Sequence, residues 1–242
     1  MTKSDDPYRH HPELRDKIAD PLTSRFRQID LSVVDKKMIE AGMPADWRVS
    51  DEAREASRAK TLSQHPANED LWLFGYGSLI WDPGFHFSEV RVATLEGYQR
   101  RFCLRSELGR GSPASPGVMV GLDVGGHCQS LAFKIPASLV HEETRLIWKR
   151  EMLRRTYQPQ FVTLSTAHGN VQALTFIVDP GCTPYMPDMP IEQVAHYVAT
   201  GAGIYGTSFE YVDNLVIHLE GLGIVDPAVT ELHTRARQLR ED

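Results

Sequence analysis

The chain has 242 residues, of which 41% are hydrophobic and 24% are charged. This is the composition of an ordinary globular protein, so wholesale disorder is excluded, and the length allows one well-packed domain with an appendage or two small domains. The formal net charge of −6 argues against a general nucleic-acid binder, because nothing offsets repulsion by the phosphates.

The first 69 residues form a polar segment of mixed charge that five prolines divide into short pieces: Pro7, Pro12, Pro21, Pro44 and Pro66. One helix is predicted over about residues 22–41 and ended by Gly42, and a second over about residues 50–64 with Ser50 as its N-cap. Neither helix has enough apolar surface for a core of its own. We therefore expect a helical N-terminal arm over residues 1–69, which packs on the domain formed by residues 70–242 or on a second subunit.

An apolar run rich in strand formers begins at Leu71 and breaks into Gly75-Tyr76-Gly77-Ser78. A strand that runs into a glycine turn exposes consecutive backbone N–H groups, which can hold a carboxylate or an amide oxygen. Each glycine also lacks the Cβ that would keep a ligand away from the main chain. The alternative is that the glycines only end a buried strand.

Short β-branched or aromatic runs bounded by Gly, Pro, Asn or Asp follow, and each predicts a strand: residues 90–94, 99–105, 118–123, 129–135, 161–165 and 171–178. Gly125-Gly126 and Gly169-Asn170 lie between neighbouring runs and predict hairpin turns. Together with residues 71–76, these runs favour an α+β fold with a curled or closed, mixed β-barrel-like sheet flanked by helices.

A helix is predicted among the strands at about residues 137–153. Val140, Thr144, Ile147 and Glu151 lie on one face of it, with Trp148 beside them. A glutamate among apolar neighbours near the negative end of a helix should have a raised pKa, which suits general acid–base chemistry near neutral pH. The alternative is a surface ion pair between Glu151 and a neighbouring arginine: Arg150, Arg154 or Arg155.

Three further helices are predicted toward the end of the chain. Apolar residues with helical spacing occupy residues 191–198, with Gly201 beyond them, and residues 212–222, before Gly223. The last helix begins near Pro227, because proline suits the first position of a helix.

Neither a metal site nor a cofactor site is indicated by the sequence. The histidines are dispersed, Gly75 and Gly77 do not continue into a nucleotide-binding motif, and no nucleophile elbow occurs. Three scattered cysteines, Cys103, Cys128 and Cys182, fit a reducing compartment. The first residues lack an apolar stretch of signal-peptide length, and no run is long enough to span a membrane, so we expect a cytoplasmic protein.

Several ordered blocks of the chain resemble one family, the ChaC-like glutathione-specific γ-glutamylcyclotransferases. The signature is Phe74-Gly75-Tyr76-Gly77-Ser78-Leu79 followed by Ile80-Trp81, and the further blocks are residues 97–102, 110–117, 148–152 with Tyr157, 197–201, 210–211 and 223–227. The resemblance spans about residues 71–239. It departs from the family in residues 110–117, which read Arg-Gly-Ser-Pro-Ala-Ser-Pro-Gly where the family has a threonine and usually a glutamate, and in the long N-terminal arm.

The resemblance implies a γ-glutamylcyclotransferase-like fold and the cleavage of glutathione to 5-oxoproline and cysteinylglycine. It assigns Glu151 as the general acid and base, residues 74–79 as the loop that holds the glutamyl α-carboxylate or the oxyanion, and Tyr157 as a residue that orients the substrate or Glu151. Arg105 and Arg110 are candidate partners for the glycine carboxylate. No cofactor, metal, nucleic acid or membrane is implied, and a homodimer through the N-terminal arm is conceivable. Two alternatives stay open: a cyclotransferase for another γ-glutamyl compound such as a γ-glutamylamine, or a non-catalytic binding protein that regulates cation transport.

Overall fold

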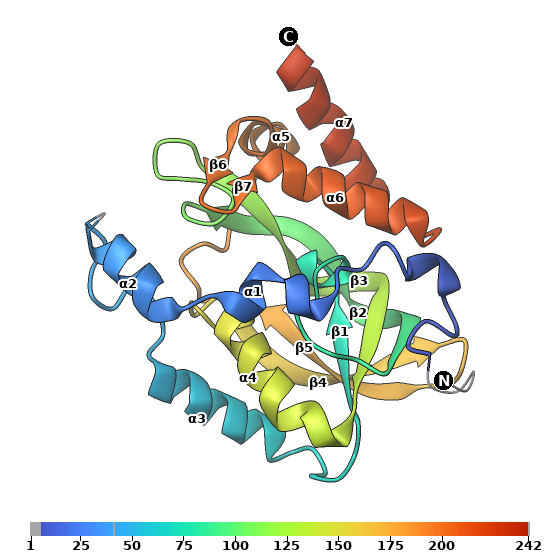
Figure 1. The fold of residues 1–242 in the computed structure, drawn as a ribbon. Coiled ribbons are helices and arrows are strands. Elements are labelled where there is room, and N and C mark those ends of the chain that lie inside the picture. The colour runs from blue at the N-terminus through green and yellow to red at the C-terminus, as the bar shows by residue number, and fades with distance from the viewer. Residues whose placement is uncertain (1–5, 41, 242) are drawn as a thin grey trace.

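A closed five-stranded barrel forms the centre of the computed structural model, with strand order β1-β3-β2-β4-β5 (Figure 1). The strands are β1 (Leu71–Gly75), β2 (Glu89–Ser106), β3 (Gly117–Ile135), β4 (Tyr157–Thr166) and β5 (Val171–Val178). Neighbouring strands pair antiparallel except β1 and β5, whose parallel pairing closes the barrel. The predicted α+β fold with a closed sheet is therefore confirmed.

The structure describes residues 6–40 and 42–241. Residues 1–5, Ala41 and the last residue of the chain lie outside the described residues. They include the predicted helix end at Ala41 and part of the segment on which the expected lack of a signal peptide rested.

The two long strands differ from the prediction. We expected Gly125-Gly126 to be a hairpin turn, but both residues lie within β3, where the pairing with β2 shifts register between Glu96 and Tyr98. Gly97, Gly125 and Gly126 all have positive φ, at 82°, 116° and 56°. Glycines with positive φ serve bulges as well as turns, and a bulge bends a strand pair without ending it, which helps the sheet to close. The predicted turn at Gly169-Asn170 is confirmed, because it joins β4 to β5.

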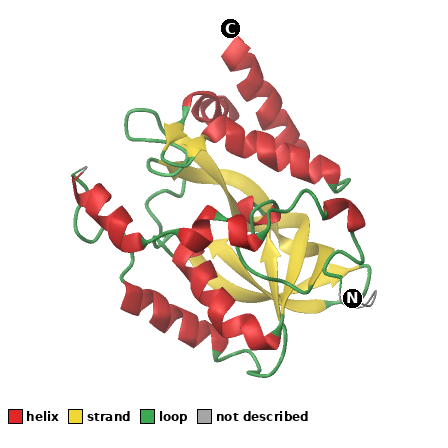
Figure 2. Ribbon diagram, viewed as in Figure 1, coloured by secondary structure: helices red, strands yellow, loops and turns green. Residues whose placement is uncertain are grey.

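The helices lie in two groups with the strands between them (Figure 2). One group contains α5 (Ile191–Thr200), α6 (Ser208–Gly221) and α7 (Pro227–Glu241), which pack on one another as their apolar spacing predicts. The small sheet of β6 (Ala202–Gly203) and β7 (Gly206–Thr207) connects α5 to α6. The other group contains α4 (Val140–Glu151), preceded by η4 (Ala137–Leu139), and the longer helices of the arm, whereas the start of the arm lies beside the end of α6, where Lys17 Nζ donates to the carbonyl of Gly221 at 3.4 Å (Figure 1). No helix among the described residues is both long and apolar enough to cross a bilayer.

The N-terminal arm is more broken than its sequence suggests. It contains η1 (Pro12–Leu14), η2 (Pro21–Thr23), α1 (Arg25–Gln28), α2 (Leu31–Glu40) and α3 (Asp51–Leu62). The single helix predicted over residues 22–41 is wrong, because Ile29 is extended, with ψ of 123°, and the Asp30 carboxylate accepts a hydrogen bond from the Ser32 N–H at 2.9 Å. The second predicted helix is confirmed as α3, with the Ser50 hydroxyl capping the Ala53 N–H at 3.2 Å.

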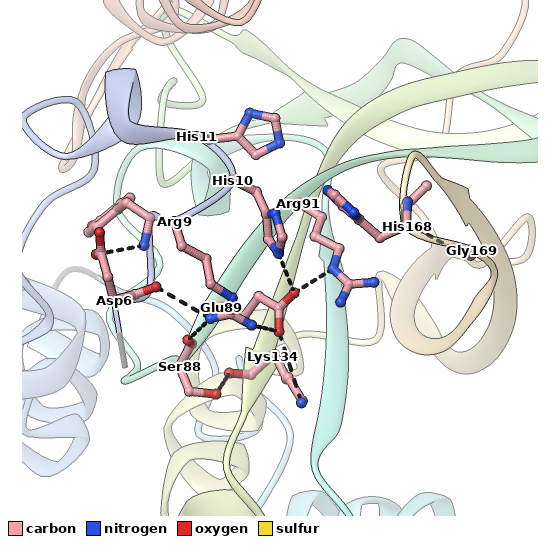
Figure 3. A network of polar contacts seen from close by, with 12 residues as sticks. Asp6, Arg9, His10, His11, Ser88, Glu89, Arg91, Lys134, His168 and Gly169 are labelled. Atoms are coloured by element: carbon pink, nitrogen blue, oxygen red, sulfur yellow. Dashed lines mark hydrogen bonds and ion pairs between the residues drawn. The ribbon is translucent and has the colours of Figure 1, made fainter. Parts of the chain in front are cut away.

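The arm packs along the barrel of its own chain. Leu14 and Ile18 are buried in the same apolar core as the barrel strands. Near the start of the arm, Arg9 and His10 contact Glu89 at the beginning of β2, in a network that also includes Arg91 and Lys134 (Figure 3). The Glu89 side chain is only 1% exposed in this network, which we call the Glu89 cluster. The division of the chain into an arm and a domain near residue 70 stays a prediction.

Candidate active site

A cavity of about 240 Å³ opens where the loop after β1, the end of α4 and the connection between β2 and β3 meet. Its wall carries five arginines against three carboxylates: Arg25, Arg105, Arg110, Arg150 and Arg154, and Asp82, Glu107 and Glu151. Aromatic side chains complete it: Phe26, Trp81, Tyr157, Tyr205 and Tyr211. An excess of cations in a partly apolar cavity suits a small organic anion.

Glu151 is the last residue of α4. The stripe predicted for this helix is present, because Thr144, Ile147 and Trp148 are at most 2% exposed. The carboxylate at the end of the stripe has a side chain that is 15% exposed and lines the cavity. Burial raises the pKa of Glu151, and the charge of Arg150 only partly opposes the effect.

The alternative of an ion pair is also found, but the pair does not lie on the surface. Arg150 Nε is 3.0 Å from Glu151 Oε1, and the two side chains are 8% and 15% exposed. The same guanidinium donates to Ser78 Oγ at 2.6 Å and to the carbonyl of Asp82 at 2.5 Å. Arg150 therefore joins the carboxylate at the end of α4 to the loop after β1.

Three tyrosines lie close enough to the carboxylate to feel its charge: Tyr76 and Tyr211 are buried, and Tyr157 is partly buried. Burial raises the pKa of Tyr76, Tyr157 and Tyr211, and the negative charge of Glu151 raises each pKa further. All three phenols are therefore neutral at physiological pH. Tyr157 and Tyr211 line the cavity, whereas the Tyr76 hydroxyl donates to the carbonyl of Phe176 at 2.7 Å.

The predicted loop over residues 74–79 contributes one residue to the cavity lining. Only Ser78 of this loop is part of the lining, while Phe74, Tyr76 and Leu79 are buried in the apolar core. Among the described residues, the N–H groups of Gly77, Ser78 and Leu79 have no hydrogen-bond acceptor. A Cβ added at Gly77 would lie 2.9 Å from the Tyr211 hydroxyl oxygen, so glycine permits the close approach of α6.

Arg105 and Arg110 both line the cavity. Arg105 Nη2 forms an ion pair with Glu107 at 2.7 Å, but its Nε is buried without a partner among the described residues. Arg110 Nη1 donates to the carbonyl of Thr207 at 3.3 Å. Each guanidinium thus keeps donors that a bound carboxylate could use.

Several lining residues have no role in the sequence-based prediction: Arg25, Phe26, Tyr205 and Tyr211. Tyr211 lies in one of the blocks that resemble the family, so the resemblance already contained a signal for it. Arg25 and Phe26 belong to the arm, for which no functional role was predicted from the sequence. Nothing in the local sequence of α1 indicates that these two residues line a cavity. The described residues contain no group of three His, Cys, Asp or Glu side chains arranged to hold a metal ion.

Comparison with known proteins points to one family. The family model described as ChaC-like protein matches residues 71–239. A glutathione-specific gamma-glutamylcyclotransferase of Escherichia coli is 37% identical over 191 residues, which cover 78% of this chain and 83% of that protein. Glutathione-specific gamma-glutamylcyclotransferase 1 of Rattus norvegicus is 31% identical, with 72% of this chain and 82% of the relative covered.

A solved structure shares the fold. The crystal structure of a yeast gamma-glutamyl cyclotransferase specific to glutathione superimposes with a TM-score of 0.66 at 20% sequence identity, covering 72% of this chain and 98% of that one. At this level of identity the likeness concerns the fold alone.

Proposed function

The chain belongs to the ChaC-like protein family, and from this premise we propose that it cleaves glutathione to 5-oxoproline and cysteinylglycine. It is a γ-glutamylcyclotransferase, a lyase that closes a ring while it breaks a C–N bond. The observation that carries the mechanism is the partly buried carboxylate of Glu151, with its raised pKa, in the wall of an arginine-rich cavity.

The reaction needs no nucleophile from the protein. The free α-amine of the γ-glutamyl unit attacks its own γ-carbonyl carbon and closes a five-membered lactam ring. The bond from that carbon to the cysteine nitrogen then breaks, and the nitrogen leaves as the amine of cysteinylglycine. The attacking nitrogen changes from an ammonium to the N–H of the lactam and so loses two protons, of which one reaches the leaving nitrogen as it becomes an amine and the other goes to solvent. The protein has to hold the reactive conformer, accept a proton from the attacking nitrogen and return one to the leaving nitrogen.

We assign both proton transfers to Glu151. A carboxylate must be ionised to take the proton and must then hold it until the leaving nitrogen needs it. A raised pKa brings the carboxyl group closer to the neutral range in which both tasks are possible. The neutral hydroxyl of Tyr157, in the same wall, would orient the substrate or Glu151.

The loop after β1 supports an assignment to the substrate's negative charge. The N–H groups of Gly77, Ser78 and Leu79, which no acceptor among the described residues occupies, are available for the glutamyl α-carboxylate or for the oxyanion of the tetrahedral intermediate. Phe74, Gly75 and Tyr76 would act by supporting this main chain. Arg105 and Arg110, which also line the cavity, would hold the glycine carboxylate.

The test is incubation of the purified protein with glutathione and detection of 5-oxoproline. N-acetylated glutathione and the α-linked peptide Glu-Cys-Gly should both remain intact, because neither can present a free α-amine to a γ-carbonyl. Cleavage of either would identify a peptidase with another nucleophile. A γ-glutamylamine as a better substrate would favour the alternative cyclotransferase, and binding of glutathione without turnover would favour a regulatory protein.

We also infer a cytoplasmic location and keep the homodimer as a prediction. All three cysteines are free, which suits a reducing compartment. The arm exposes the apolar side chains of Leu22, Val33 and Ile39, which supports an arm-mediated contact between two copies. Light scattering of the protein in solution measures its mass and tests the homodimer.

A further inference from the structure

The N-terminal arm contributes to the cavity wall through α1, although this helix lies outside the residues that match the family. Arg25 and Phe26 both line the cavity. The buried Ser24 caps α1 by accepting a hydrogen bond from the Phe26 N–H at 3.3 Å. On the other side of Phe26, Arg27 Nη1 donates to Glu143 Oε2 at 2.7 Å, and the Glu143 side chain is 1% exposed. Phe26 is therefore held between two fixed neighbours.

Phe26 lies against the guanidinium that contacts Glu151. Its ring centroid is 4.0 Å from Arg150 Cζ, well inside the range of about 6 Å over which a cation and an aromatic face attract each other. Tyr205 packs against the same ring, with centroids 5.9 Å apart and an interplanar angle of 63°. The guanidinium thus has an aromatic face on one side while its nitrogens contact Glu151, Ser78 and the carbonyl of Asp82.

We propose that Phe26 is a positioning residue of the active site, which stacks on Arg150 and so keeps the guanidinium against Glu151 and Ser78. The inference rests on the proposed function for its kinetic readout only. It assigns the arm a part in the chemistry, because Phe26 influences the charge environment of the carboxylate through Arg150.

The groups that face Glu151 determine in which direction its pKa should change if Arg150 moves. Arg150 is the cation paired with the carboxylate, and the other groups close to it are the neutral phenols of Tyr76, Tyr157 and Tyr211. The remaining charges of the cavity wall are Arg25, Arg105, Arg110 and Arg154, with Asp82 and Glu107. If Arg150 moves away, burial acts on Glu151 with less opposition, and the pKa of Glu151 rises.

The experiment compares Phe26→Leu with the wild type across pH. Leucine keeps an apolar side chain but removes the aromatic face, so we expect kcat at neutral pH to fall roughly three- to tenfold. The acid limb of the kcat profile should move to higher pH by about half a pH unit or more. Phe26→Tyr and Phe26→Trp keep an aromatic face and should restore both values.

Tyr8→Leu is the matched control. Tyr8 is also an aromatic residue of the arm, with Arg15 Cζ 5.4 Å from its ring centroid and the ring of Phe87 packed edge-on at 5.7 Å. It is not part of the cavity lining. Tyr8→Leu should lower the melting temperature and leave the pH profile unchanged.

A second readout is independent of turnover. The titration of the Glu151 carboxyl carbon, followed by NMR and assigned by its loss in Glu151→Gln, should report a higher pKa in Phe26→Leu. If this variant does not fold, Phe26→Met is the second variant, because methionine keeps an apolar side chain without an aromatic face and should shift the titration in the same direction. An unchanged pKa of Glu151 in the folded variants overturns the positioning role. Wild-type protein that makes no 5-oxoproline overturns the proposed function instead, and the titration still decides the role of Phe26.

Discussion

Two glutamates, Glu89 and Glu151, are both withdrawn from solvent but lie in different surroundings. Glu89 is 1% exposed at the start of β2, and Glu151 is 15% exposed at the end of α4. The carboxylate of Glu89 faces Arg9, His10, Arg91 and Lys134, whereas that of Glu151 faces one guanidinium, that of Arg150. Burial alone penalises the charged form of both.

The outcome differs because the number of cations differs. At Glu89, burial pushes the pKa up, but the hydrogen bond from Arg91 and the charges of Arg91, Arg9 and Lys134 outweigh it, so the pKa is lowered. At Glu151, burial outweighs the charge of Arg150, and the pKa is raised. A buried carboxylate with several cations is a fixed ion that holds the arm to the barrel, while one with a single cation stays able to exchange a proton.

Glu151→Gln should have the largest effect on activity. The amide keeps the size of the side chain but cannot accept the proton, so turnover should fall by a factor of order 10² to 10⁴ while substrate affinity changes little. The stability of the variant at neutral pH should equal or exceed that of the wild type, because a poorly compensated charge has been removed. Steady-state kinetics and a melting curve on one preparation measure both. Near-wild-type formation of 5-oxoproline would show that another group moves the proton.

Glu89→Gln should give the opposite pattern. Removing the charge leaves a set of cations without their common partner, and we expect a loss of about 3 kcal/mol in the free energy of unfolding, at the low end for a broken buried ion pair because Arg9 and Lys134 are partly exposed. The folded fraction should keep its kcat. Chemical denaturation measures the stability, and steady-state kinetics on the same variant measure kcat. A fall in kcat would mean that the Glu89 cluster is coupled to the active site around Glu151.

Gly77→Ala should have a smaller effect, felt mainly at the site. The added methyl would lie 2.9 Å from the Tyr211 hydroxyl and 3.0 Å from Val120 Cγ1, so the loop or α6 must shift. We expect the activity to fall on the order of tenfold, with weaker substrate binding, beyond what the melting temperature accounts for. Unchanged kinetics in folded protein would show that the glycines of the loop only end β1 and do not contribute to substrate binding.

The smallest effects should appear in the pH dependence of stability, with opposite signs for the two glutamates. The folded pKa of Glu89 is lowered, so its contribution is complete above the unfolded pKa of about 4.3 and is lost as pH falls through the folded value. The folded pKa of Glu151 is raised, so its contribution is complete below about 4.3 and is lost as pH rises through the folded value.

Urea denaturation of the wild type, Glu89→Gln and Glu151→Gln from neutral pH down to about pH 3, below the unfolded pKa of about 4.3, measures these contributions. The advantage of the wild type over Glu89→Gln should shrink as pH falls. Where the wild type is less stable than Glu151→Gln at neutral pH, this difference in stability should disappear as the pH falls. Parallel curves for all three proteins would contradict the assignment of different pKa values.

The features that could be predicted from the sequence are those that depend on residues close together in the chain. Alternation and helical spacing predicted the strands and α4, and Ser50 predicted the start of α3. The stripe on α4 is buried as predicted, and Glu151 is the last residue of this helix. The resemblance to a family added the loop and Tyr157, whose roles stay proposals.

The features that escaped prediction depend on partners far along the chain. Nothing near Glu89 indicates that Arg9 reaches it, and nothing near Phe26 indicates Arg150, which is more than a hundred residues away. A glycine pair such as Gly125-Gly126 is compatible with a turn and with a bulge, and only the partner strand decides between them. The break in the predicted helix at Ile29, by contrast, has a local signal that the prediction missed, because the Asp30 carboxylate accepts a hydrogen bond from the Ser32 N–H at 2.9 Å.

The parallel pairing of β1 with β5 has a consequence for how the enzyme folds during its synthesis. Leu73 pairs with Leu174, so the ring of strands closes only after about a hundred intervening residues have been ordered. Pairings of such long range slow folding, because the entropy of the chain is lost before the contacts form. The cavity wall runs from Arg25 to Tyr211, so a nascent chain on the ribosome has no complete active site until α6 has emerged. Catalytic competence is thus a late event of synthesis, and partly made chains leave cellular glutathione untouched.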